Sequence, residues 1–341
     1  MRVVHFHEPL IGVIAEVPLS VAQDQTWQRA RISAFKNVCE IVQEREIDCV
    51  LISGRLFGDE YVTNAVITEV LEVIANTACP IIWMPGSNGK QYLQHKNNIP
   101  NNLIVLDDEN PSYVAGELCI RNWSAGSSSN DSCNILFYDR PQPMGTSMLK
   151  ILYRSVSELT YIITNEAFYI RGENEFKKLD IRKIEKAGFD DSTSCGFFLL
   201  NILGGKLIDS EIIEQRMYNF TTVKLEIEDE DNPKSVLRKC MKATAGLADH
   251  DFVRIVLTGN ITVETFINTE ELRNALKNRF FYIEIFNSCE LELDEDIYTT
   301  DISLRSEFIR MVMADDSLSE NEKSRIIQCG WNALRGKELS E

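Results

Sequence analysis

Short apolar runs alternate with amphipathic stretches over the first part of the chain. Runs suited to buried strands occur at Val3–Phe6, Cys49–Ser53 and Pro80–Met84. Between them, apolar residues recur at helical spacing over Trp27–Glu46 and Asn64–Ala78, so each of these stretches has one apolar face. The order βαβαβ predicts a parallel sheet with helices packed on it.

The rest of the chain predicts more strands and then a second unit. Strands are expected at Leu103–Leu106, Ala115–Ile120, Asn134–Tyr138, Tyr161–Thr164 and Phe197–Leu203. After about residue 216, strands and helices alternate again, at Val223–Ile227, Lys234–Ala245, Phe252–Leu257, Glu270–Lys277 and Phe280–Phe286, and two amphipathic helices follow at Ile302–Met313 and Glu320–Leu334. The fold class is therefore α/β (α+β by some schemes), with domains at 1–215 and 216–341.

Composition and charge narrow the class of partner. A hydrophobic content of 44% over 341 residues fits a globular protein with a sizeable core. The 35 Lys and Arg against 52 Asp and Glu give a net charge of −17. Such a field repels nucleic-acid backbones, so any DNA contact requires a local basic patch.

The nine cysteines are scattered and form no Cys-x-x-Cys pair, so no disulfide framework is expected. The chain opens on a strand-like run without a signal-peptide pattern, and no apolar run approaches the length of a membrane span. We therefore predict a reduced, cytoplasmic location and no membrane partner.

Three loops follow the first three predicted strands, at Glu8–Gly12, Gly54–Gly58 and Gly86–Gly89. The carboxyl ends of parallel strands meet at one edge of the sheet, so these loops are expected to converge there. The residue presented after the second strand is Arg55. We expect an ion pair between Arg55 and Glu8, and the alternative is an arginine that binds phosphate. The two roles are compatible.

The same loops resemble a known family. Val3–Gly12 lines up without gaps on the opening motif of the SbcD-type DNA repair exonucleases, which belong to the calcineurin-like metallophosphoesterases. Ile47–Gly58 is similar to that family's strand ending in Gly-Asp-Leu-Phe-Asp, and Pro85–Gly89 to its Gly-Asn-His-Asp loop. Gly188–Phe198 resembles the segment that closes the catalytic domain, and Val253–Gly259 resembles a strand of the capping domain. The helical C-terminal tail is most similar to the YhaO-like branch.

This resemblance implies a metallophosphoesterase-like αββα sandwich followed by a smaller α/β capping domain. It also implies a site that clamps a phosphodiester between two divalent cations, such as Mn, Mg or Fe. At the positions that correspond to the family's ligands, however, the residue types differ. The vestigial pocket consists of Glu8 and Leu10 from the first motif, Arg55 and Gly58 from the second, Ser87 and Asn88 from the third, and Asp139 after a later strand.

The chain has only four histidines, His5, His7, His95 and His250, which are too few for a histidine-rich two-metal cluster. A guanidinium between two cations would also repel each of them by several kcal/mol, about 4 kcal/mol per unit charge at about 4 Å. No cofactor is therefore expected. The alternative is a residual metal site formed by His7, Glu8, Asn88 and Asp139. We expect His5 and His7 to face opposite sides of their strand, so that at most one reaches the pocket.

Two further stretches concern partners. Five basic residues, Lys177, Lys178, Arg182, Lys183 and Lys186, form the stretch best placed to follow a phosphate backbone, although neighbouring glutamates favour a solvated face. The two C-terminal helices are expected to pack on the second domain, and an amphipathic tail of this kind can also hold a partner helix.

Three functions remain open from the sequence. The first is a non-catalytic SbcD-like subunit that binds a DNA end or a partner, with an SbcC-like ATPase as the partner that the resemblance implies. The second is a phosphodiesterase or nuclease that works with one metal ion or with none. The third is a protein-binding scaffold without nucleic-acid contact, which the net charge of −17 favours.

Overall fold

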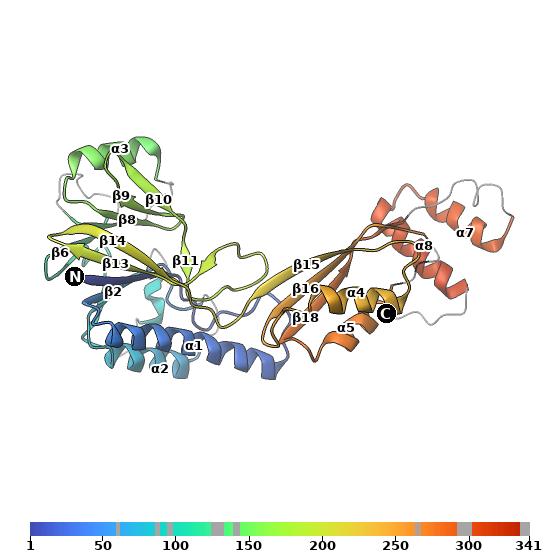
Figure 1. Cartoon of the computed structure of the whole chain (residues 1–341), viewed down its shortest axis with the longest axis horizontal. Coiled ribbons are helices and arrows are strands. Elements are labelled where there is room, and N and C mark those ends of the chain that lie inside the picture. Colours follow the sequence, from blue (N-terminus) through green and yellow to red (C-terminus); the bar gives the residue numbers. More distant parts are fainter. Residues whose placement is uncertain are drawn as a thin grey trace. The chain divides into compact units, whose positions relative to one another are not determined.

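The computed structural model describes residues 1–58, 62–85, 89–93, 98–123, 133–138, 144–262, 265, 267–291 and 302–334. The chain divides into two compact units, Met1–Met217 and Tyr218–Glu341 (Figure 1). Each unit has its own hydrophobic core. Both contain parallel sheets with helices packed on them, so the fold is of the α/β class.

The first sheet of the N-terminal unit is mainly parallel, with the order β12-β11-β1-β2-β3-β4. Along one side of β1 lies first β13, antiparallel over Arg2 to His5, and then β11, parallel at His7. β13 continues into the hairpin partner β14. The strands are β1 (Arg2–His7), β2 (Cys49–Ser53), β3 (Ile81–Met84), β4 (Leu103–Val105), β11 (Arg182–Lys183), β12 (Ser194–Cys195), β13 (Phe197–Leu203) and β14 (Lys206–Ile213).

The second sheet has the order β10-β9-β8-β7-β6-β5. Its central strands β6, β7 and β8 are parallel, and antiparallel strands complete it at both ends. The strands are β5 (Ser112–Ala115), β6 (Leu118–Asn122), β7 (Ile135–Tyr138), β8 (Tyr161–Thr164), β9 (Phe168–Arg171) and β10 (Phe176–Leu179).

The two sheets face each other, and helices cover their outer faces (Figure 1). α1 (Val21–Glu44) and α2 (Asn64–Ala75) pack on the first sheet, and α3 (Thr146–Ser155) packs on the second. Alternation along β1 explains the layers, because Val4 and Phe6 enter the core under the helices and Val3 enters the core between the sheets. The unit therefore has four layers, helix, sheet, sheet and helix.

Several elements differ from the sequence prediction. α1 begins at Val21 instead of Trp27, because Ser20 and Gln23 form a capping box that starts the helix earlier. The stretch predicted as one strand at Ala115–Ile120 contains the last residue of β5, a turn in which Gly116 adopts a φ of 58°, and the first residues of β6. The sequence suggested a single strand because Ala115, Leu118 and Ile120 all enter the same core, although a turn separates Ala115 from the other two. α3 and β14 were not predicted.

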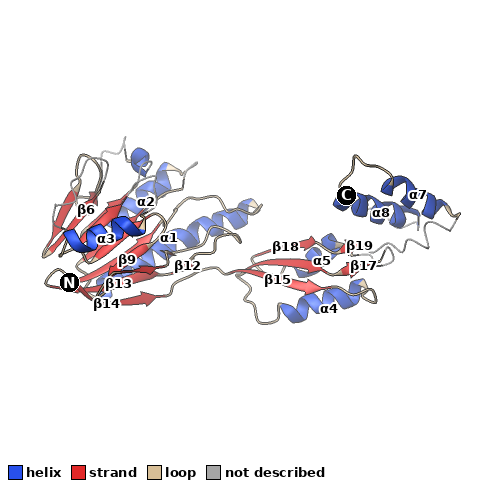
Figure 2. Ribbon diagram, turned by 90° about the horizontal axis from the view of Figure 1, so that it is seen from above, coloured by secondary structure: helices blue, strands red, loops and turns tan. Residues whose placement is uncertain are grey.

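The C-terminal unit contains a parallel sheet, β15-β16-β18. α4 and α5 pack on it, as Figure 2 shows, through a core that includes Val236, Cys240, Leu272 and Leu276. The bounds are β15 (Phe220–Glu226), α4 (Pro233–Ala243), β16 (Phe252–Thr258), α5 (Thr269–Leu276) and β18 (Tyr282–Asn287), with a short pair formed by β17 (Asn260–Ile261) and β19 (Glu290–Leu291). All five longer elements lie close to their predicted ranges.

The two C-terminal helices are α7 (Leu304–Met313) and α8 (Glu320–Leu334), and they pack against each other (Figure 2). Ile309, Val312 and Ile327 form the buried seam between them. Both helices were predicted from their apolar spacing.

All nine cysteines lie in the described part of the chain, and none of them forms a disulfide, as predicted. Across the described residues, no helix combines the length and the apolar character needed to cross a membrane.

The side chain of Asn134 links the second sheet to the first, and its substitution tests how much this link contributes to stability. Its side chain accepts from the Cys119 amide at 2.8 Å and donates to the Gly205 carbonyl at 3.2 Å, which joins the strand β6 to the β13–β14 turn. In Asn134→Ala, these buried groups lose their partner, and we expect the free energy of unfolding to fall by about 1–3 kcal/mol. Urea unfolding would measure this, with exposed Asn101→Ala as the control. Equal stability of both variants would contradict this role.

Candidate functional site

The carboxyl ends of β1, β2 and β3 lie at one edge of the first sheet. The Glu8 amide donates to the Ser53 carbonyl at 2.9 Å, and the Gly54 amide donates to the Met84 carbonyl at 2.9 Å. Ile11 and Phe57 form a parallel bridge, so the loops after β1 and β2 run together. This convergence was predicted from the strand order. Ser87, Asn88 and Asp139 lie outside the described residues, so their part in the predicted pocket is not tested.

The first loop has an unusual backbone. Glu8 and Leu10 have φ values of 41° and 49°, in the left-handed region that non-glycine residues rarely adopt. Gly54 packs so closely that a Cβ atom there would lie 2.7 Å from Cγ of Glu8. Glycine is therefore required at position 54, and the loop after β2 fixes where the Glu8 side chain can lie.

Arg31, on α1, holds this loop in place. Its side chain is 2% exposed, and it donates to the carbonyl oxygens of Pro9 at 3.0 Å, Leu10 at 3.2 Å and Lys186 at 2.8 Å. Burial lowers the pKa of Arg31 to about 10, which still leaves it charged at neutral pH. Arg31 was not predicted to belong to this site, since an arginine within an amphipathic helix gives no sign in the sequence that it is buried.

Four charged side chains form a connected cluster at this edge, which we call the Glu8 cluster: Glu8, Arg55, Lys183 and Asp191. Arg55 Nε donates to Glu8 Oε1 at 3.1 Å, as the sequence predicted. Lys183 Nζ lies 3.5 Å from Glu8 Oε2 and 3.5 Å from Asp191 Oδ2. Two carboxylates thus share two fixed positive charges.

Lys183 and Asp191 were not predicted to belong to this site. Lys183 reaches Glu8 because β11 runs beside β1, with Lys183 opposite His7. Asp191 follows in the loop before β12, where its Oδ1 accepts from the Thr193 amide and hydroxyl. No local sequence signal marks this pairing, because only the order of strands in the sheet joins these distant segments.

The charges in the cluster stabilise each other. Burial raises the pKa of Glu8, but the positive charges of His7 when protonated, Arg55 and Lys183 outweigh it, and the net pKa is lowered. Burial likewise opposes ionisation of Asp191, yet hydrogen bonds from Thr193 and the charge of Lys183 keep its pKa below the usual value. Both carboxylates are therefore ionised at neutral pH and balance Lys183 and Arg55.

This arrangement does not fit the two divalent cations that the resemblance implies. The carboxylate oxygens that a metal ion would need, on Glu8 and Asp191, face Lys183 and Arg55 instead. A divalent cation held about 4 Å from one of these positive groups would be repelled by about 8 kcal/mol at an effective dielectric constant of about 20. Among the described residues, no group of three or more His, Cys, Asp or Glu side chains is arranged to hold a metal ion.

Leu10 and Gly58 lie at positions where the resemblance implies metal ligands, and both have structural contacts here. Leu10 is 4% exposed and belongs to the apolar interior. The Gly58 amide donates to the Ile11 carbonyl at 2.9 Å, and a Cβ atom at Gly58 would lie 2.8 Å from the Val13 backbone. Neither residue offers a side-chain ligand, so both serve the packing of the two loops.

The expectation that His5 and His7 face opposite sides of β1 is wrong. Residues two apart on a strand share a face, and both rings contact residues of the second sheet. Ser53 Oγ lies 2.9 Å from His5 Nε2 and 2.9 Å from His7 Nδ1, and His5 Nδ1 lies 2.8 Å from the Tyr161 hydroxyl. The Phe168 ring packs edge to face with both imidazoles. Its centroid lies 4.4 Å from that of His5 and 5.9 Å from that of His7.

These two histidines are neutral at physiological pH. Burial lowers the pKa of His7 to about 4, with Glu8 opposing the change and Lys183 and Arg55 adding to it. Burial and the neighbouring His7 lower the pKa of His5 well below its ordinary value. Because His7 carries no charge near neutrality, Arg55 and Lys183 supply the positive charge that stabilises ionised Glu8 there.

The residues of the predicted basic cluster are divided between two sheets. Lys177 and Lys178 lie on β10 of the second sheet, whereas Arg182 and Lys183 lie on β11 of the first. Lys183 is only 16% exposed and is paired with Glu8 and Asp191. The stretch is divided because the chain passes from one sheet to the other between these residues.

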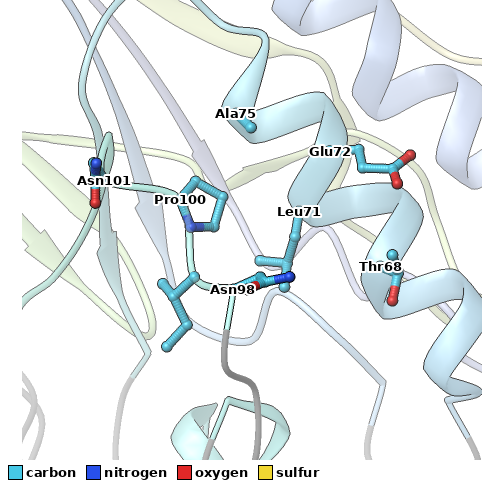
Figure 3. Close-up of a pocket in the computed structure, with 8 residues that line it drawn as sticks. Thr68, Leu71, Glu72, Ala75, Asn98, Pro100 and Asn101 are labelled. Atoms are coloured by element: carbon cyan, nitrogen blue, oxygen red, sulfur yellow. The ribbon is translucent and has the colours of Figure 1, made fainter.

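A separate cavity of about 590 Å³ lies beside α2, and Figure 3 shows its lining. Leu71, Ala75, Ile99 and Pro100 supply apolar surface, and Glu72 is its charged side chain. No residue of the Glu8 cluster lines it, so this cavity is not part of the site at the strand ends.

The chain matches no protein-family model, and no curated protein matches it. The family resemblance of the loop motifs therefore remains a prediction.

The buried histidines predict how stability depends on pH. The unfolded chain protonates His7 near pH 6.5, whereas the folded protein resists protonation until about pH 4. Stability should thus be complete above about pH 7 and fall as the pH decreases toward 4, by up to about 1.4 kcal/mol per pH unit for each histidine. Urea unfolding of the wild type and of His7→Gln at a series of pH values would measure this. The free energy of unfolding of His7→Gln should depend less steeply on pH than that of the wild type. Identical slopes for the two proteins would contradict the prediction.

Proposed function

We propose that the chain is a non-catalytic relative of the SbcD-type exonucleases, in which the Glu8 cluster takes the place of the two divalent cations. The observation that carries this proposal is the sharing of the Glu8 carboxylate by Arg55 and Lys183. Fixed side-chain cations can hold the loops together, but they cannot activate a water molecule as metal ions do.

The layered architecture supports the same proposal. A helix–sheet–sheet–helix unit followed by a smaller α/β unit is the arrangement that the family resemblance implies. The loops that converge at the strand ends are the loops that carry the similar motifs. The scaffold is thus compatible with the family, and the difference lies in the charges at the site.

We further propose that the protein acts by binding a protein partner, with an SbcC-like ATPase as the partner implied by the resemblance. The α7–α8 pair supports this, because it presents apolar side chains outside its buried seam. Leu304 is 71% exposed and Met311 is 68% exposed. An amphipathic helix pair with exposed apolar residues suits a partner helix. DNA binding is the less favoured mode, because the net charge is −17 and the basic cluster is divided between two sheets.

Metal content tests the first part of the proposal. Purified protein incubated with Mn²⁺ and then desalted should retain far less than one metal ion per chain, because Arg55 and Lys183 repel it. Elemental analysis would measure this, with Lys177→Met as a control that removes an exposed lysine elsewhere. About two Mn or Fe ions per chain would refute the proposal. Hydrolysis of a generic phosphodiester that is lost in both Arg55→Ala and Glu8→Gln would favour the enzyme alternative instead.

Substitutions on α7 test the partner surface. Leu304→Asp and Met311→Asp each place a charge where a partner helix would bury an apolar side chain, and each should weaken binding of the co-expressed ATPase subunit at least about tenfold. Ile208→Asp is the matched control, since Ile208 is an exposed apolar residue of the other unit. Unchanged co-purification of both α7 variants would contradict this surface. DNA binding at low salt that is lost in Lys177→Glu would favour DNA-end binding.

A further inference from the structure

A continuous chain of polar side chains crosses the space between the two sheets and ends at the Glu8 cluster. It runs from the Tyr161 hydroxyl on β8 to His5 on β1, then to Ser53 on β2 and His7 on β1, with distances of 2.8, 2.9 and 2.9 Å. His7 Nε2 then lies 3.8 Å from Glu8 Oε2. All four side chains are buried, with exposed fractions of 5% or less.

Two arrangements of the hydrogen atoms keep the Ser53 hydroxyl hydrogen within this chain, since a hydroxyl that donates to one imidazole must accept from the other. If both imidazoles donated to Ser53, its own hydrogen would have no acceptor among these contacts. If Ser53 donates to His7 Nδ1, then His5 Nε2 donates to Ser53, the Tyr161 hydroxyl donates to His5 Nδ1, and His7 Nε2–H points to Glu8. In the reverse arrangement, both imidazoles carry their hydrogen on Nδ1, and a lone pair on His7 faces the carboxylate.

Electrostatics distinguishes these two arrangements. A contact of 3.8 Å is longer than a hydrogen bond, but an ionised carboxylate at that distance still attracts an N–H and repels a lone pair. Lys183 and Arg55 act on the pKa of His7 in the opposite sense, and each of them contributes less than Glu8 does. Phe168 packs on both rings and adds no charge.

We propose that the Tyr161–Ser53 chain is a polarised hydrogen-bond relay whose direction is set by the charge of Glu8. The relay conveys the charge state at the strand ends to Tyr161 on the second sheet. Anything that neutralises the Glu8 carboxylate, such as protonation or the substitution Glu8→Gln, removes the preference and allows both tautomers to exchange. This inference does not depend on the proposed function, because it rests only on the contacts among these side chains.

Nitrogen NMR of the full chain, labelled with ¹⁵N on histidine alone, tests the relay. The chain has four histidines, so His95→Gln and His250→Gln would assign the remaining two sets of signals to His5 and His7. In the wild type near neutral pH, both rings should show a protonated Nε2 and an unprotonated Nδ1. An Nδ1–H tautomer on either ring would overturn the proposed direction, and this measurement needs no change at the site itself.

Two variants then test the control by Glu8. In Glu8→Gln, the His5 and His7 signals should move toward the values of the other tautomer, because the charge that selects the direction is gone. Arg55→Gln keeps the carboxylate and should leave both tautomers unchanged. A Glu8→Gln protein with wild-type tautomers, or an Arg55→Gln protein with reversed ones, would refute control by Glu8. Neither result bears on metal content or partner binding, so this inference and the proposed function fail independently.

Discussion

The carboxylate of Glu8 is the group on which the other features of this site depend. It lies at the end of the central strand β1, on a left-handed backbone, and is held between the loop after β2 and the end of β11. A half-buried carboxylate requires compensation, and here two side-chain cations provide it from different segments of the sheet. If Arg55 or Lys183 were removed, the other cation alone would have to balance the negative charge of Glu8. The cluster is therefore a structural link among three segments as well as a local balance of charge.

The same constraint extends into the interior. Burying two imidazoles, a serine and a tyrosine between apolar sheets is costly unless every polar atom has a partner. The chain from Tyr161 to His7 meets this requirement with one hydroxyl placed between two rings. Because each donor needs an acceptor at the next position, the orientation at one end restricts the orientation at the other. The polar groups between the sheets and the charges at the strand ends thus form one connected system.

Under the proposed function, the site is a phosphoesterase-like framework in which side-chain cations hold the loops that metal ions would otherwise bridge. An ammonium or guanidinium group can neutralise carboxylates and order a loop, but it carries one charge and has no open coordination position. Such a protein keeps the fold of the framework, and the surface of that framework remains available for binding a partner. The exposed apolar residues of α7 supply a surface with the chemistry that a partner helix requires.

The sequence alone determined the features that arise from local patterns. The βαβαβ order, the strand β2, the helix α8 and the meeting of Arg55 with Glu8 all follow from apolar periodicity and from the rule that parallel strands end at one edge. The tertiary structure alone decided that Lys183 and Asp191 join Glu8, because strand β11 lies beside β1 only once the sheet has formed. It also decided the partners of His5 and His7 and the burial of Arg31, since these depend on which segments pack against each ring and guanidinium. Periodicity indicates which face of an element is buried, but the groups that meet it there come from residues far away in the chain.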